Sequence, residues 1–232
     1  FFNYIKRVFK SLNLKKSVVI VCNSIFTRNA AVDWYKFDPS KSVIGYCGVD
    51  ESFFMKSSEF LSGKKNKQLD LSDFILTFAT GDARENYSLL PNILHNVREK
   101  GCTSKLIIAG TREGSDYVKK MDAEFKRYNL QPCIDYQFIE FLGEERIDEL
   151  IELYTTADFY LELSGHEGFG MQLAEAMACS TTCISSGAGA LTEVGAGFDL
   201  QFPTFSVNEI SSTIIDGYKN KLHIRDNSEQ VK

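Results

Sequence analysis

The stretch that decides the fold is Glu167-Gly168-Phe169-Gly170-Met171-Gln172-Leu173-Ala174-Glu175-Ala176-Met177-Ala178. It follows an apolar run over 159–163, which predicts a short buried strand. Its second half is rich in Ala, Met, Leu and Glu, which favour a helix. The first N–H groups of a helix have no internal partners and carry partial positive charge. A glycine-rich turn before such a helix is therefore a candidate site for a phosphate or a sugar oxygen.

Two carboxylates flank this turn. Glu167 precedes the predicted helix, and Glu175 lies about one and a half turns inside it. At this spacing the two side chains are able to accept hydrogen bonds from two different polyols. The alternative interpretation is an ordinary strand-to-helix turn with solvated glutamates.

A resemblance to the family-4, GT-B-fold glycosyltransferases is carried by Ser164-x-x-Glu167-Gly-Phe-Gly-x-x-x-x-Glu175-Ala-Met-Ala-Cys179. The resemblance implies that Glu167 is the catalytic residue at the donor sugar and that Glu175 holds the ribose of the nucleotide. It also implies that sugar and phosphate face the residues between them, namely Gly168, Phe169, Gly170, Met171 and Gln172. Enzymes of this family are thought to retain the anomeric configuration, with the leaving diphosphate helping to deprotonate the acceptor.

The loop after the strand predicted over 74–79 is Ala79-Thr-Gly-Asp-Ala-Arg84-Glu85-Asn86. Many relatives carry a Gly-Arg pair or an Arg-Lys-Asn run here, whose cations hold the diphosphate, so the resemblance makes Gly81 and Arg84 donor-binding candidates. Glu85 stands where the lysine is expected, and a carboxylate repels a diphosphate. Losing one charge-assisted contact costs roughly 1.5–3 kcal/mol, which Arg84 or Arg112 would have to offset. The alternative is that Arg84 is a plain loop residue.

Two further segments match the resemblance. The first is Phe141-Leu142-Gly143-Glu144-Glu145, like the family's Phe-x-Gly turn beside the nucleotide base, which makes Leu142 and Glu145 donor-binding candidates. The second is Gly187-Ala-Gly189-Ala-Leu-Thr-Glu193-Val194, like Gly-Gly-x-x-Glu-Val, where we expect Glu193 to brace the turn rather than to bind ligand. His166 is placed to act as an acid or base, but the chemistry of the motif does not require one.

Composition excludes several classes of protein. The chain has 232 residues, is 44% hydrophobic and 25% charged, and carries a net charge of −5, so we expect a soluble globular protein that does not bind nucleic acid. Six cysteines without a C-x-x-C pair and three histidines predict neither a zinc site nor a disulfide framework, which favours a reducing, cytoplasmic setting. No D-x-D occurs, so a metal-dependent GT-A enzyme is disfavoured and no metal is expected.

The start of the chain is a basic segment. Residues 1–14 place Ile5, Val8, Phe9 and Leu12 at helical spacing among lysines and arginines. Such a helix is able to contact an anionic membrane surface, or it packs on the protein with its basic face in water. The first residue is Phe rather than Met, so we expect a fragment boundary there.

Strand and helix signals alternate along the chain. Strands are predicted over 18–22, 74–79, 105–109, 134–142, 159–163, 181–185 and 198–202, and helices over 25–36, 89–100, 116–128, 147–155, 171–179, 191–194 and 206–219. Residues 55–72 are expected to form a polar surface loop. The alternation predicts a doubly wound, Rossmann-like α/β domain with a parallel sheet, whose ligands bind beyond the carboxyl ends of the strands.

The resemblance divides the chain into three parts: residues 1–43 end an acceptor-binding N-terminal domain, 44–219 form the nucleotide-sugar-binding domain, and 220–232 are a tail. The first hypothesis is a retaining hexosyltransferase that uses a UDP- or GDP-sugar and a glycan, lipid or protein acceptor. The rest of its acceptor domain lies in a missing segment or a partner subunit. The second hypothesis is a non-catalytic glycosyltransferase-like subunit with a degenerate diphosphate site. A GT-B epimerase or phosphorylase is a weaker third hypothesis. A phosphorylase of the glycogen type would need a lysine for pyridoxal phosphate, and no motif for one is visible.

Overall fold

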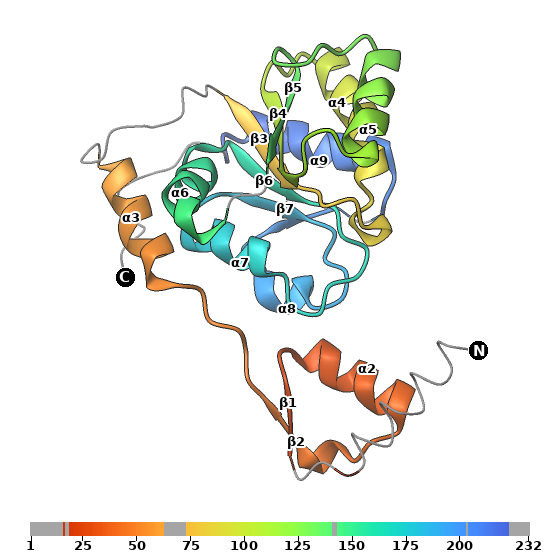
Figure 1. Ribbon diagram of the computed structural model, residues 1–232, viewed down its shortest axis with the longest axis vertical. Coiled ribbons are helices and arrows are strands. Elements are labelled where there is room, and N and C mark those ends of the chain that lie inside the picture. The colour runs from red at the N-terminus through yellow and green to blue at the C-terminus, as the bar shows by residue number, and fades with distance from the viewer. Residues whose placement is uncertain (1–15, 17–18, 63–72, 141–142, 203, 223–232) are drawn as a thin grey trace.

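The computed structural model describes residues 16, 19–62, 73–140, 143–202 and 204–222. Its N-terminal unit contains β1 (Ile20–Cys22), α2 (Ile25–Tyr35), the 3-10 turn η1 (Pro39–Lys41) and β2 (Ser42–Ile44). The strands β1 and β2 pair in parallel, and a long connection leads from β2 to the larger unit (Figure 1). The helix predicted over 1–14 lies outside the described residues.

The larger unit is built on a parallel sheet with the order β5-β4-β3-β6-β7-β8. Its strands are β3 (Phe74–Phe78), β4 (Lys105–Thr111), β5 (Tyr136–Glu140), β6 (Phe159–Glu162), β7 (Cys183–Ser185) and β8 (Leu200–Gln201). All residues of β6 and β7 are buried, as expected for a parallel sheet covered on both faces.

Helices cover both faces of the sheet (Figure 1). On one face lie α4 (Leu90–Glu99), α5 (Asp116–Arg127) and α9 (Val207–Lys219), and on the other α3 (Glu51–Leu61), α6 (Ile147–Thr156), α7 (Met171–Ala178) and α8 (Leu191–Gly195). Successive side chains of a strand point to opposite faces, so Ile75 enters the first core while Phe74 and Leu76 enter the second. The predicted doubly wound α/β architecture is confirmed.

Residues that favour helix N-termini stand where α2 and α4 begin. Ser24 caps α2, since its side chain accepts a hydrogen bond from the Thr27 N–H, and Pro91 lies in the first turn of α4. The strand predicted over 198–202 is too long. Ala196 and Gly197 have positive φ, of 48° and 83°, and form a turn that leaves Phe198 82% exposed, so that β8 keeps two residues.

The prediction of a polar loop over 55–72 is wrong for its first part, because α3 runs to Leu61. Asp50 caps this helix by accepting a hydrogen bond from the Ser52 N–H. Phe53 and Phe60, two turns apart, are both buried in the core on the α6–α7 face. The serines that suggested a loop are accommodated because their hydroxyls bond back to the carbonyl of Phe54. Residues 63–72 lie outside the described part of the chain.

Among the described residues, no helix is both long enough and apolar enough to cross a membrane. Cys22, Cys179 and Cys183 are buried, as their apolar surroundings in the sequence predict.

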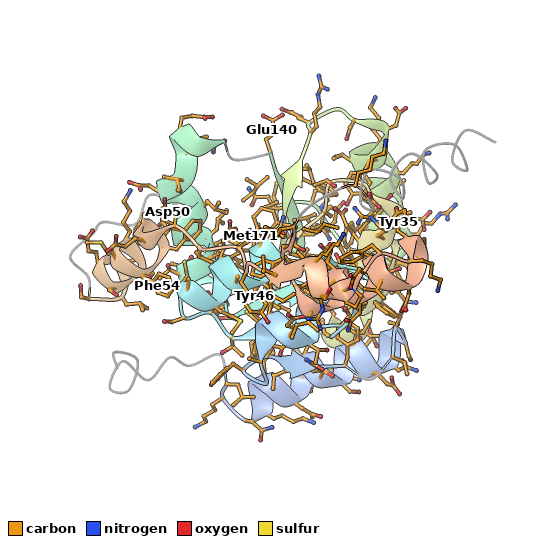
Figure 2. The ribbon with its side chains drawn as sticks, turned by 90° about the horizontal axis from the view of Figure 1, so that it is seen from below. Tyr35, Tyr46, Asp50, Phe54, Glu140 and Met171 are labelled. Carbon is orange, nitrogen blue, oxygen red and sulfur yellow. The ribbon has the colours of Figure 1, made fainter. Side chains whose placement is uncertain are left out.

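The burial of α3 makes a testable difference between two adjacent phenylalanines. Phe53 is 4% exposed, whereas Phe54, which is labelled on α3 in Figure 2, is 54% exposed. We expect Phe53→Ala to lower the free energy of unfolding by about 3–5 kcal/mol because it removes a buried ring. Phe54→Ala, with the same change in helix propensity, should alter it by less than about 1 kcal/mol. Urea denaturation measures both, and equal effects would show that α3 is not part of the core.

Candidate functional site

The order of the strands reverses between β3 and β6, which lie side by side in the middle of the sheet. In open parallel sheets, ligands bind beyond the carboxyl ends of the strands at such a switch point. The loops that follow β3 and β6 are joined there. The Gly165 N–H donates to the carbonyl of Arg84 at 2.8 Å, and the Asn86 amide donates to the carbonyl of Leu163 at 3.0 Å. The structure thus brings the Arg84 loop and the loop leading to Glu167 together.

Two glycines let the β6–α7 turn pack against the β7–α8 turn. Gly170 has φ 99°, and a Cβ there would lie 2.6 Å from a methyl group of Leu191. A Cβ on Gly189 would lie 2.5 Å from the carbonyl oxygen of Glu167, which also accepts a hydrogen bond from the Ala190 N–H at 2.9 Å. Side chains at these two positions would push the turns apart.

The backbone N–H groups of Gly168, Phe169 and Gly170 in this turn have no hydrogen-bond acceptor among the described residues. Met171 and Gln172 begin α7 and are half-buried. The Glu167 side chain is also half-buried, and no described residue donates a hydrogen bond to it. The turn therefore presents N–H donors and a carboxylate acceptor side by side.

The start of α2 contacts this turn from the N-terminal unit. The hydroxyls of Ser24 and Thr27 donate to the carbonyl of Gly168 at 2.7 and 3.0 Å. The rings of Phe26 and His166 meet edge to face, with centroids 5.2 Å apart. The helix α2 therefore lies directly against the residues on both sides of Glu167.

Glu193 of α8 holds the same helix end, and α2 lies next to α8 in Figure 1. Its carboxylate accepts hydrogen bonds from the N–H groups of Ile25 at 2.7 Å and Phe26 at 3.2 Å, and the Tyr46 hydroxyl is a further partner. Burial alone raises the pKa of Glu193, but the hydrogen bonds outweigh it and the pKa is lowered. The sequence predicts that Glu193 braces its own turn, whereas the structure shows its carboxylate bonded to the start of α2.

The carboxylate of Glu175 is hydrogen-bonded to Tyr154 of α6. The Tyr154 hydroxyl donates to Oε2 of Glu175 at 2.9 Å. The Tyr154 ring is fully buried against Phe53 and Phe78. Burial raises the pKa of Glu175, and the Tyr154 hydrogen bond opposes that rise.

The charged side chains of Arg84 and Glu85 are bonded within the loop after β3. Arg84 is 57% exposed and forms two side-chain hydrogen bonds with Asp82, at 3.1 Å from Nε and 3.0 Å from Nη2. The carboxylate of Glu85 accepts hydrogen bonds from the N–H groups of Thr80 at 2.8 Å and Gly81 at 3.1 Å, and from the Thr80 hydroxyl at 2.6 Å. The N–H groups of Thr80 and Gly81 are therefore already bonded within the protein.

The two remaining predicted positions are Leu142 and Glu145. Leu142 lies outside the described residues. Glu145 lies in the 3-10 turn η4 (Glu144–Arg146), is exposed, and has its carboxylate folded over Gly143. No hydrogen bond of the described residues joins Glu145 to the loops at the switch point.

A third carboxyl, of which the motifs give no indication, lies at the end of β6. Glu162 is 8% exposed and accepts hydrogen bonds from the Tyr160 hydroxyl at 2.7 Å and the Ser164 N–H at 2.9 Å. Burial raises its pKa. Through Ser164 it holds the start of the loop that carries Glu167. The only signal in the sequence is an acidic residue inside an apolar run.

The strand order and the glycine turn at its switch point define a Rossmann-type ligand-binding domain. The chain belongs to the group 1 glycosyl transferases, whose family model matches residues 61–230. The resemblance to GT-B glycosyltransferases is therefore confirmed.

Similar proteins agree with this assignment. The chain is 26% identical over 223 residues to the O-antigen chain mannosyltransferase B of Escherichia coli, covering 93% of this chain and 55% of that protein. It is 28% identical over 170 residues to the serotype-specific mannosyltransferase WbdA of Escherichia coli, covering 70% of this chain and 20% of that protein. The crystal structure of Anabaena HepE in complex with UDP and glucose superposes with a TM-score of 0.72 at 19% identity, over 94% of this chain and 58% of that chain. The chain thus spans about half the length of two of these proteins and a fifth of the third.

The hydrogen bonds between Glu193 of α8 and the start of α2 predict faster amide exchange in Glu193→Ala. Without the carboxylate, the N–H groups of Ile25 and Phe26 lose their acceptor, so we expect their hydrogen exchange to become roughly fivefold faster or more. Because the pKa of Glu193 lies below its ordinary 4.5, the wild-type contact is present at neutral pH and is lost as the pH falls through that lowered value.

The matched control is Glu209→Ala, which removes an exposed carboxylate of α9 that bonds Thr204 and not α2. Exchange is followed at single amides by NMR. Unchanged exchange at Ile25 and Phe26 in Glu193→Ala would contradict the contact.

Proposed function

We propose that this chain carries the nucleotide-sugar-binding half of a retaining, family-4-type glycosyltransferase. Residues 44–219 would form that half, and residues 1–43 the end of the acceptor-binding half. The observation that carries the proposal is the β6–α7 turn at the switch point. There the N–H groups of Gly168, Phe169 and Gly170 have no described acceptor, and they lie beside the carboxylate of Glu167, to which no described residue donates a hydrogen bond.

The proposed roles follow from this geometry. Glu167 accepts a hydroxyl of the donor sugar, and Glu175 accepts a hydroxyl of the ribose. The N–H groups at the start of α7, from Gly168 to Gln172, stabilise the negative charge that grows on the diphosphate as the glycosidic bond breaks. The acceptor hydroxyl gives its proton to an oxygen of the departing diphosphate and bonds to the anomeric carbon on the same face. The protein acts by positioning and electrostatics, without a metal ion.

The donor and acceptor are chosen from chemistry and from the names of relatives. Two relatives are named as mannosyltransferases, which supports a hexose and in particular mannose as the sugar transferred. A fold neighbour is described in complex with UDP and glucose, so both uridine and guanosine donors are to be tested. The acceptor is a glycan, a lipid or a protein, bound with the remainder of the N-terminal half.

Binding of UDP, GDP and their hexose conjugates by calorimetry tests the proposal directly. We expect one of the two nucleotides to bind saturably, and Glu175→Gln to weaken it about tenfold by removing a charged acceptor. Glu167→Gln should weaken the sugar conjugate but not the bare nucleotide. Glu113→Gln, which changes an exposed carboxylate on the loop after β4, is the control. The proposal fails if no nucleotide binds, or if Glu175→Gln binds as tightly as the wild type.

A second candidate function is supported by the loop after β3. Glu85 bonds the N–H groups of Thr80 and Gly81, and Arg84 is paired with Asp82. These contacts neutralise the groups that would grip a diphosphate. They favour a glycosyltransferase-like subunit that binds without catalysing transfer.

Glu85→Lys separates the two candidates. If the diphosphate site is degenerate, the lysine frees two N–H groups and adds a cation, and nucleotide affinity should rise about tenfold or more. If Glu85 is part of a working loop, its loss disorders residues 80–81 and affinity should fall. Glu85→Gln is the matched variant, because its amide oxygen keeps a hydrogen-bond acceptor without the charge.

A further inference from the structure

A buried tyrosine lies under the proposed ribose-binding carboxylate. Tyr154 reaches Glu175 from α6, 21 residues earlier in the chain, and the two side chains meet at 2.9 Å. No described residue donates a hydrogen bond to the other carboxylate oxygen, Oε1. One oxygen of Glu175 is therefore held by the protein and the other is left for a ligand.

The Tyr154 ring is held firmly. It is fully buried, stacks on Phe78 with centroids 5.7 Å apart, and meets Tyr160 edge to face at 5.7 Å. Phe53 of α3 closes a third side, with its centroid at 6.2 Å. A ring packed in this way holds its hydroxyl oxygen in a fixed position beside Glu175.

We infer that Tyr154 is a positioning residue for the nucleotide donor: it fixes one oxygen of Glu175 so that the other accepts the ribose hydroxyls. The inference rests on the proposed function of Glu175. It assigns to α6, which carries none of the recognised motifs, a part in donor binding. Orienting an acceptor before the ligand arrives lowers the entropy cost of binding.

The hydrogen bond also governs the charge of Glu175. Burial favours the protonated acid, and donation from Tyr154 favours the carboxylate. Burial raises the pKa of Tyr154 most, and the nearby Glu175, Cys179 and Glu162 raise it further, so Tyr154 stays protonated and remains a donor. Tyr160 is a further titratable neighbour of Tyr154. From α3, the Phe53 carbonyl accepts from the Cys179 thiol. Glu193 of α8 is engaged with α2. The pKa of Glu175 should therefore rise when the Tyr154 hydroxyl is removed.

The test is calorimetric titration of UDP and GDP from about pH 5 to about pH 8 with wild type and Tyr154→Phe. We expect Tyr154→Phe to bind the preferred nucleotide roughly three- to tenfold more weakly at neutral pH. Its loss of affinity in acid should begin at a higher pH, because a carboxyl with a raised pKa is protonated sooner. Tyr136→Phe is the matched control, since it removes another buried tyrosine hydroxyl that donates to a carboxylate, Asp122, in the core on the other face.

A second variant guards against a simple folding defect. Incorporation of 3-fluorotyrosine at position 154 keeps the ring and makes its hydroxyl a stronger donor. The fall of nucleotide affinity at low pH, here called the acid limb, should therefore move to lower pH. In the Glu175→Gln background the part of the pH dependence that is due to Glu175 should disappear, and Tyr154→Phe should add no further shift.

The outcomes are distinguishable. If wild type binds neither nucleotide, the proposed function fails and the inference fails with it. If wild type binds, and neither Tyr154→Phe nor the fluorotyrosine variant moves the affinity or the acid limb beyond the Tyr136→Phe control, only the role of Tyr154 is overturned.

Discussion

The site depends on one close approach of backbone to backbone. Position 189 must be glycine, because a Cβ there would lie 2.5 Å from the carbonyl oxygen of Glu167. The hydrogen bond from Ala190 to the same oxygen ties the β7–α8 turn to the β6–α7 turn. Gly170 permits the same packing from the other side, against Leu191. This contact therefore fixes the position of α8 relative to the turn that carries Glu167.

The second consequence of that packing is the placement of α2. Since α8 is fixed on the turn, its Glu193 presents a carboxylate to the N–H groups of Ile25 and Phe26, while Gly168 presents its carbonyl to Ser24 and Thr27. The N-terminal unit therefore meets the larger one through hydrogen bonds made by the residues around the site. One of these junctions is Gly168, next to Glu167.

Much of the fold follows from local signals in the sequence. Apolar runs, helix formers and glycines place the strands and helices from Phe74 to Lys219 within a few residues, and the glycine-opened helix identifies the β6–α7 turn. The exception is α3, whose serines resemble a loop although Phe53 and Phe60 lie at helical spacing. The partners of the site residues are different, because they come from distant positions. Tyr154 is 21 residues from Glu175, and Ile25 is 168 residues from Glu193. No local pattern contains such contacts, since they exist only after the sheet has brought the strand ends together.

The five glutamates around the switch point differ in what they have left to offer a ligand. Glu85 and Glu193 each satisfy two backbone N–H groups, and Glu162 satisfies a tyrosine hydroxyl and a backbone N–H. A carboxylate bonded in this way stabilises the protein but has less capacity for another hydrogen bond. Glu175 is bonded through one oxygen, and no described residue donates to Glu167. The hydrogen-bond partners of these glutamates thus separate two groups that the sequence alone does not distinguish. Glu85, Glu162 and Glu193 stabilise the loops, whereas Glu167 and Glu175, which flank the glycine turn, keep carboxylate oxygens to which no described residue donates.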